Sequence, residues 1–166
     1  MTYFEDLSTY DYRDLDTFER SWGWLQFRPE YRRIAVGWLD APYAFEKGPV
    51  PAGFAARLLD IVAGPPVNSM RGWHDCSHCP PSSDADAAML SVELPSGAVA
   101  LGHTEIRVPA RPGVVFAAPS LIWHYVTVHA YLPPAEFIAA VQAYEPRWAD
   151  EPSPWVPPDA ERTTFD

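Results

Sequence analysis

Two cysteines separated by two residues are the part of this sequence best suited to chemistry. Cys76 and Cys79 are the only cysteines of the chain, and His74 and His78 stand beside them. Two thiolates at this spacing can bind one Zn²⁺ ion, because a tight backbone turn brings both sulfur atoms to the same point. A closed structural zinc site needs four protein ligands. The pair therefore predicts one half of a zinc site.

Histidines farther along the chain are expected to complete the site. Four residues separate His124 from His129, which is within the gap found in sites of two cysteines and two histidines. Residues five apart on a regular α-helix point about 140° away from each other, so both can reach one ion only if the helix loosens near His129. If it stays regular, His74 can take the last place. We predict Cys76, Cys79 and His124 as ligands, with His74 and His129 as alternatives for the fourth position.

Two other histidines are not expected to bind the ion. His78 lies inside the turn between the cysteines, where side chains usually point outward. His103 lies on an expected strand, where a lone histidine is more often a solvated or core residue. The run from His103 to Glu105 has the His-x-Glu spacing of zinc deaminases, but in those enzymes it precedes the cysteines and lies on a helix. A deaminase is therefore excluded.

The cysteine pair has two other interpretations. It could be a redox dithiol, since Trp73 lies ahead of the pair and thioredoxin also has a tryptophan before its two cysteines. Thioredoxin, however, has its tryptophan directly before the first cysteine and a helix after the pair, whereas here Pro80 and Pro81 follow. The pair could also be two unrelated buried thiols. A zinc site is favoured over both.

The composition limits the partners that we expect. Twelve lysines and arginines stand against 22 aspartates and glutamates, giving a net charge of −10. Nucleic acid is not expected, because binding its phosphates requires a basic surface. A membrane span is not expected either, since no apolar run approaches 18 residues, and the first residues lack the features of a signal peptide. We expect a cytoplasmic protein with reduced or metal-bound cysteines and an unidentified protein or small-molecule partner.

The elements that must position these residues follow from turn signals and apolar periodicity. Strands are expected at residues 33–40, 89–94, 98–108 and 114–117. Helices are expected at residues 51–63, from Pro119 and from Pro133, because proline suits the first turn of a helix. Strands followed by helices indicate the α+β class. We predict a small antiparallel sheet with about three helices around a zinc knuckle.

The chain is expected to form one domain with a tail. Its length of 166 residues suits a single domain with its own core. We assign residues 1–144 to an α+β domain that contains the metal site. Residues 145–166 hold five prolines among acidic residues, so we predict a Pro-rich acidic tail that is partly disordered, which Trp148 and Trp155 could hold to the domain.

Several stretches resemble an uncharacterised family of small bacterial proteins. The stretches are Tyr3–Tyr10, Val36–Asp40, GxHxCxxC at residues 72–79, Glu105–Val108, and APxLIxHYVxxHxYxPPxEF at residues 118–137. The resemblance spans most of residues 3–141 and implies that these stretches belong to one domain, without implying an activity. Separately, the expected order of knuckle, hairpin and helix over residues 73–130 resembles a treble-clef zinc fold.

Two functions are compatible with these residues. In the first, four protein ligands close the coordination shell, the zinc is structural, and the protein acts as a binding or accessory protein. In the second, three ligands and a water hold the zinc of a hydrolase or lyase, with the pKa of the water lowered to about 7. Glu105, Arg107 and Tyr125 would then be the base, the anion holder and the proton donor. We favour the first function, and the number of protein ligands distinguishes the two.

Overall fold

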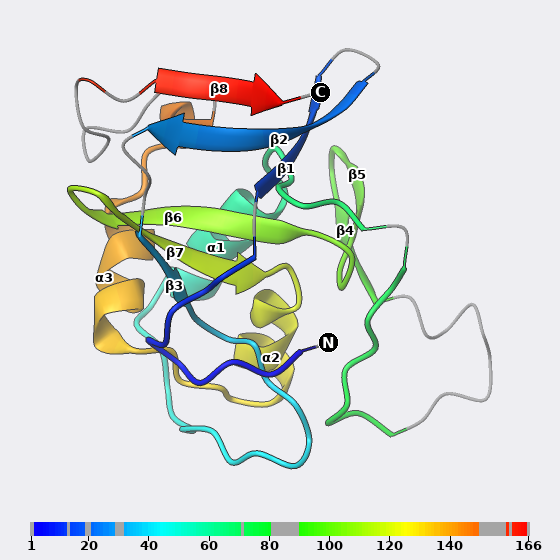
Figure 1. Ribbon diagram of the computed structural model, residues 1–166. Helices are drawn as coiled ribbons and strands as arrows, with labels where there is room; N and C mark the ends of the chain where they lie inside the picture. Colours follow the sequence, from blue (N-terminus) through cyan, green and yellow to red (C-terminus); the bar gives the residue numbers. More distant parts are fainter. Residues whose placement is uncertain are drawn as a thin grey trace.

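The computed structural model describes residues 2–12, 14–18, 21–28, 32–70, 72–80, 90–149, 159 and 161–165 (Figure 1). The elements in chain order are β1 (Asp14–Phe18), β2 (Ser21–Arg28), β3 (Arg32–Ala35), α1 (Phe54–Val62), β4 (Ser91–Leu94), β5 (Gly97–Ala100), β6 (Glu105–Arg111), β7 (Val114–Pro119), α2 (Ile122–Val128), α3 (Ala135–Ala143), the short 3₁₀ helix η1 (Pro146–Ala149) and β8 (Glu161–Phe165). Met89, the first residue of an expected strand, and Trp155 of the tail lie outside the described residues.

A three-stranded sheet in the order β3-β7-β6 forms the centre of the molecule. Strands β6 and β7 are an antiparallel hairpin, whereas β3 runs parallel to β7, with Ile34 opposite Phe116. Parallel neighbours need a long crossover connection, and the chain between β3 and β7 supplies one that includes α1. The predicted α+β class with three α-helices and small sheets is confirmed, with the addition of this parallel pair.

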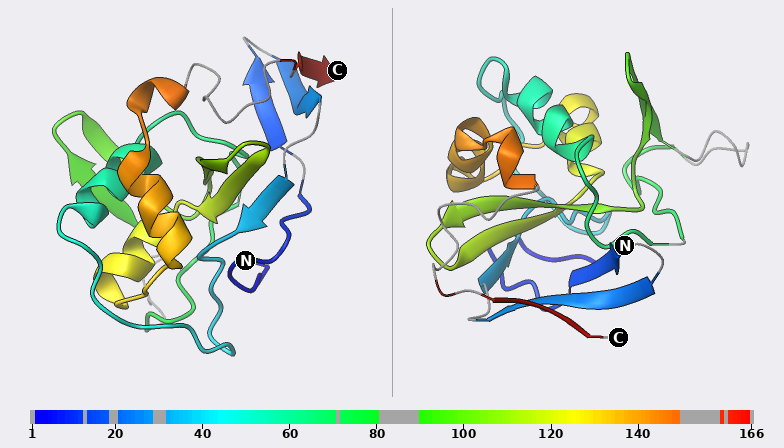
Figure 2. Two further views of the ribbon diagram at one scale, coloured as in Figure 1. Left: turned by 90° about the vertical axis from the view of Figure 1, so that its left-hand side faces the viewer. Right: turned by 90° about the horizontal axis from the view of Figure 1, so that it is seen from above.

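Helices cover one face of the central sheet (Figure 2). The apolar stripe expected on the first helix is buried in α1, from Phe54 to Val62. In α3, Phe137 and Val141 are buried, and the Phe137 ring meets the Phe116 ring of β7 edge-on, with 5.5 Å between centroids. Ile106, on β6, belongs to the same cluster. The main apolar core therefore lies between the sheet and the helices.

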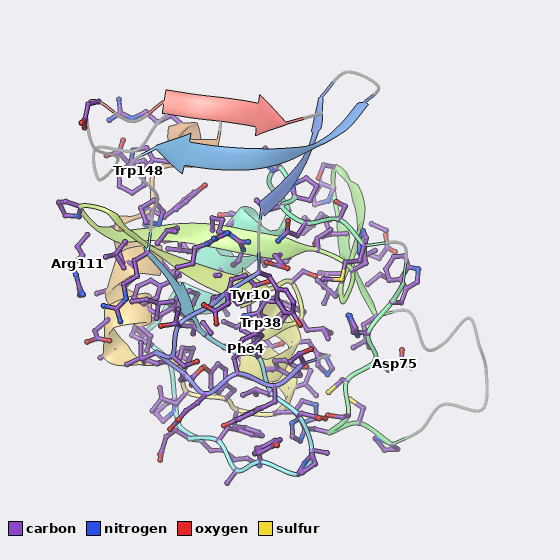
Figure 3. All side chains as sticks on the ribbon, in the orientation of Figure 1. Phe4, Tyr10, Trp38, Asp75, Arg111 and Trp148 are labelled. Atoms are coloured by element: carbon purple, nitrogen blue, oxygen red, sulfur yellow. The ribbon has the colours of Figure 1, made fainter. Side chains whose placement is uncertain are left out.

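The opposite face of the central sheet carries a second, aromatic cluster. Ala35 and Ala117 point to this face because side chains alternate along a strand. Tyr10 and Trp38 pack on the two alanines, and Phe4 packs against them (Figure 3). The Trp38 indole N–H donates to the carbonyl of Ala117 at 2.9 Å. The antiparallel sheet β1-β2-β8 lies on this side, away from the helices (Figure 2).

The tail contributes regular structure that the sequence did not suggest. Strand β8 pairs antiparallel with β2, so that Phe165 lies opposite Trp24. Before it, the ring of Trp148 in η1 lies 5.8 Å from the ring of Tyr144.

None of the helices in the described part of the chain has the length and apolar run needed to cross a bilayer.

The expected strand over residues 98–108 is divided in two, and the division matters for the cysteines. Strand β5 ends at Ala100 and β6 begins at Glu105. Between them Gly102 has a φ of +88°, which lies outside the β region of backbone conformations. The Gly102 N–H donates to the Ser120 hydroxyl at 2.9 Å, and its carbonyl accepts from the His74 N–H at 2.9 Å. The segment that leads to the cysteines is thus fastened beside the start of β6.

Candidate metal centre

The two cysteines lie on a tight turn that follows the segment anchored at His74. The Cys79 N–H donates to the Cys76 carbonyl at 3.1 Å, which closes the turn. The backbone N–H groups of His78 and Cys79 hydrogen-bond to the Cys76 sulfur and favour its thiolate form. On the outer side, the Ser77 hydroxyl accepts from the Ala41 N–H at 2.9 Å. Both cysteines are free thiols, available to a metal.

The two histidines of the site come from α2 and from the residue that ends it. His124 is buried within the helix, whereas His129 follows Val128 with a non-helical φ of −102°. Ala130 then adopts a φ of +56°, which turns the chain out of the helical path. The end of the helix before His129 is the loosening that convergence of both histidines requires. As a result, the rings of His124 and His129 lie 5.0 Å apart.

Four side-chain atoms converge on one point. Nε2 of His129 lies 3.2 Å from Sγ of Cys76, 3.4 Å from Sγ of Cys79 and 3.2 Å from Nε2 of His124. Nε2 of His124 lies 3.3 Å from Sγ of Cys79. A tetrahedral zinc site with bonds of about 2.05 Å to nitrogen and about 2.3 Å to sulfur has edges of about 3.3–3.6 Å between these atom types. These four distances are close to such edges, and all four atoms lie within 4.8 Å of one another, so the residues could hold one ion, and we call them the metal centre.

The metal centre has a buried side and an open side. Cys76 and His124 are 5% and 6% exposed, whereas Cys79 and His129 are partly exposed. Burial raises the pKa of Cys76 to about 11 and lowers the pKa of both histidines below the ordinary value. The imidazoles are thus neutral, as ligands must be, while a buried thiolate at Cys76 needs a cation beside it.

Only some of the residues expected at the site lie together. Among the described residues, the metal centre is the one group of three or more histidine, cysteine or carboxylate side chains close enough to share an ion, and His74 is outside it. His103 lies apart, with its ring 4.2 Å from that of Trp73. The structure thus places His129, and not His74, beside the other three residues.

The residues considered for catalysis are divided between two places. Glu105 and Arg107 form an ion pair with each other at 2.8 Å on β6, and Glu105 is outside the metal centre. Tyr125, in contrast, lies at the edge of the metal centre, with its ring centroid 6.1 Å from that of His124 and 6.4 Å from that of His129. Gly102, which holds His74, also supports the site, and its signal in the sequence is a glycine inside an apolar strand pattern, which indicates close backbone approach.

Comparison with known proteins gives one match. Residues 2–142 match the model of a family described as a domain of unknown function, DUF7919. This range contains all four residues of the metal centre and excludes η1 and β8. No curated protein and no solved structure matches the chain.

Proposed function

The chain belongs to the DUF7919 family, and we propose that it is a zinc protein whose ion is structural and which acts as a binding or accessory protein. The observation that carries the proposal is the convergence of two sulfur and two nitrogen donors within 4.8 Å of one another. The acidic surface implied by the net charge of −10 suits a protein or small-molecule partner better than nucleic acid. We also infer a reducing compartment such as the cytoplasm, where both thiols stay available.

The donor set favours zinc among the common metals. Thiolates and imidazoles in a tetrahedral arrangement suit Zn²⁺, whereas Mg²⁺ and Ca²⁺ prefer oxygen ligands, and no carboxylate belongs to the metal centre.

The cysteine pair and the histidine pair are far apart in the sequence, so an ion that binds both joins two segments of the fold. An ion held by Cys76 and Cys79 on one side and by His124 and His129 on the other cross-links the knuckle to the end of α2.

That cross-link supports a structural role. The ion would add to the hydrogen bonds that tie the knuckle to the rest of the chain, from Ala41 to Ser77 and from His74 to Gly102. Binding free energy at such a site is available to folding, because the ligands converge only in the folded chain. Four protein ligands also leave no open position for a water or substrate, which disfavours the alternative of a metal-dependent hydrolase or lyase.

The chemistry of the thiols disfavours a redox dithiol. A reactive cysteine needs a low pKa, because the thiolate is the nucleophile. Burial instead raises the pKa of Cys76 to about 11. A metal ion reverses this preference by neutralising the thiolate. The same residue is therefore better suited to ligation than to disulfide exchange.

Elemental analysis of the purified chain tests the proposal. We expect one zinc per chain in the wild type, less than a tenth of that in Cys76→Ser, and an unchanged content in His74→Ala, the matched control that removes a neighbouring histidine outside the metal centre. Removal of zinc with a chelator should lower the melting temperature of the wild type and leave that of Cys76→Ser unchanged. Wild-type protein that folds equally well and carries no metal after growth with zinc would refute the proposal.

A further inference from the structure

His78 has a polar atom for which the described structure supplies no partner. Its Nε2 is buried and has no hydrogen-bond partner among the described residues. Leaving such an atom without a partner is unfavourable, so buried nitrogens without one are rare in native proteins. The metal centre does not explain this cost, because His78 is outside the group of four converging residues.

The ring of His78 is held beside the open side of the metal centre. It lies edge-on to Phe45, with 5.1 Å between centroids, and edge-on to Tyr125 at 6.1 Å. The next ring is that of His129, at 5.7 Å. The ring of His78 therefore lies beside that of His129, the partly exposed nitrogen ligand.

Hydrogen bonds hold the backbone of the turn that contains His78. Its N–H is bonded to the Cys76 sulfur, and the turn that contains it is closed by the hydrogen bond from Cys79 to Cys76. A rotation about the side-chain torsions therefore moves the imidazole without moving the cysteines. His129, by contrast, is the residue that ends α2, with its N–H bonded to the Tyr125 carbonyl and a non-helical φ of −102°.

We propose that His78 is an alternative fourth ligand, which binds the ion in place of His129. In the exchange, the bond from the ion to Nε2 of His129 breaks and a bond to Nε2 of His78 forms. Both imidazoles bind as neutral donors, so no proton or electron needs to be supplied. Cys76, Cys79 and His124 hold the ion throughout. The inference rests on the proposed function and adds a route by which a four-coordinate ion is loaded and released at the open side.

Cobalt binding tests the exchange, because Co²⁺ replaces zinc and its visible absorption reports tetrahedral coordination and thiolate ligation. We would compare His129→Ala, His129→Ala with His78→Phe, and the control His129→Ala with His103→Phe. Phenylalanine preserves the ring that packs on Phe45. The single variant and the control should bind one Co²⁺ per chain with a tetrahedral spectrum and an affinity about 10–100-fold below that of the wild type. The variant without His78 should bind at least about tenfold more weakly than the control and lose the tetrahedral spectrum.

Equal affinity and equal spectra for the control and the variant without His78 would overturn the inference and leave the proposed function intact. Failure of the wild type to bind metal would instead reject the proposed function. If removal of His129 prevents folding, the rate of zinc transfer to a chelator decides the question in otherwise intact protein. His78→Phe should transfer zinc about tenfold more slowly than the wild type or His103→Phe, and equal rates would refute the exchange.

Discussion

Replacing Gly102 with alanine should weaken metal binding without touching a ligand. Gly102 has a φ of +88°, and a Cβ at this position would overlap with the carbonyl oxygen of His74. His74 leads directly into the knuckle, and its N–H donates to the Gly102 carbonyl at 2.9 Å. Because the overlapping atom belongs to the backbone, rotation of a side chain cannot relieve the overlap. The segment that carries Cys76 must therefore move.

Three costs add to the expected change. A left-handed backbone costs alanine about 1–2 kcal/mol. Overlap in a packed region costs about 1–3 kcal/mol, and loss of the bond between His74 and Gly102 about 0.5–1.5 kcal/mol. The sum, about 2.5–6.5 kcal/mol, is a large part of the 5–15 kcal/mol by which a domain is ordinarily stable. Zinc affinity should fall about tenfold or more, since loss of the groups that orient metal ligands reduces affinity by about 10–100-fold.

Gly113→Ala is the matched control. Gly113 also has a left-handed backbone, with a φ of +71°, but nothing lies within 4 Å of its would-be Cβ. Its substitution should therefore cost only the backbone contribution of about 1–2 kcal/mol and leave zinc affinity unchanged. Urea unfolding of the zinc-loaded and chelated forms gives the stabilities, and competition with a coloured chelator gives the affinities.

The comparison can fail in two ways. If Gly102→Ala destabilises the protein no more than Gly113→Ala, the contact between Gly102 and His74 does not constrain the fold. If Gly102→Ala is strongly destabilised in the chelated form but binds zinc with wild-type affinity, the contact supports the fold without positioning the knuckle. Either result would refute the positioning role inferred for Gly102.

Three further predictions concern protons and buried charge. Burial raises the pKa of Cys76 to about 11, so zinc binding at pH 7 should release at least the proton of this thiol, and zinc affinity should rise from pH 7 to 9. Calorimetry in two buffers of different ionisation enthalpy detects the released proton. Zinc binding without proton release would contradict the prediction. Tyr131→Phe removes a 2.7 Å bond to Asp6 that lowers the pKa of that carboxyl, which burial already raises. The substitution should lower the free energy of unfolding by about 1–3 kcal/mol, and this loss should shrink as Asp6 protonates on acidification toward pH 4. Urea unfolding measures the loss, and a loss that does not depend on pH would count against the prediction. Arg107→Met should lower the free energy of unfolding by about 3–5 kcal/mol, because it leaves the buried Glu105 unpaired. Adding Glu105→Gln should restore part of this stability, and a double variant less stable than the single variant would contradict the prediction.

Much of the fold could be predicted from local patterns. The apolar stripe of α1 and the two prolines before α3 mark helices whose existence depends on the residues nearby. The hairpin β6-β7 follows from the turn that contains Gly113. The parallel pairing of β3 with β7 and the addition of β8 to β2 could not be predicted, because strand partners far apart in sequence are chosen by packing of whole faces.

Three of the four residues of the metal centre, Cys76, Cys79 and His124, could be predicted from the sequence. Spacing alone brings Cys76 and Cys79 to one point, and a tight turn is sufficient for that geometry. The choice between His74 and His129 could not be made, because it depends on where α2 ends and on where the knuckle lies. A regular helix would have placed His124 and His129 about 140° apart.

The sequence by itself therefore determined that sulfur and nitrogen atoms can bind an ion, that Cys76 and Cys79 can bind it together, and that helices lie near the site. These features depend on residues within a few positions of one another. Only the tertiary structure decided that the chain leaves the helical path at Ala130, that Gly102 holds the knuckle through His74, and that His78 lies beside His129. The contacts between His74 and Gly102 and between His78 and His129 join segments far apart in the sequence, so no local pattern records their free energies.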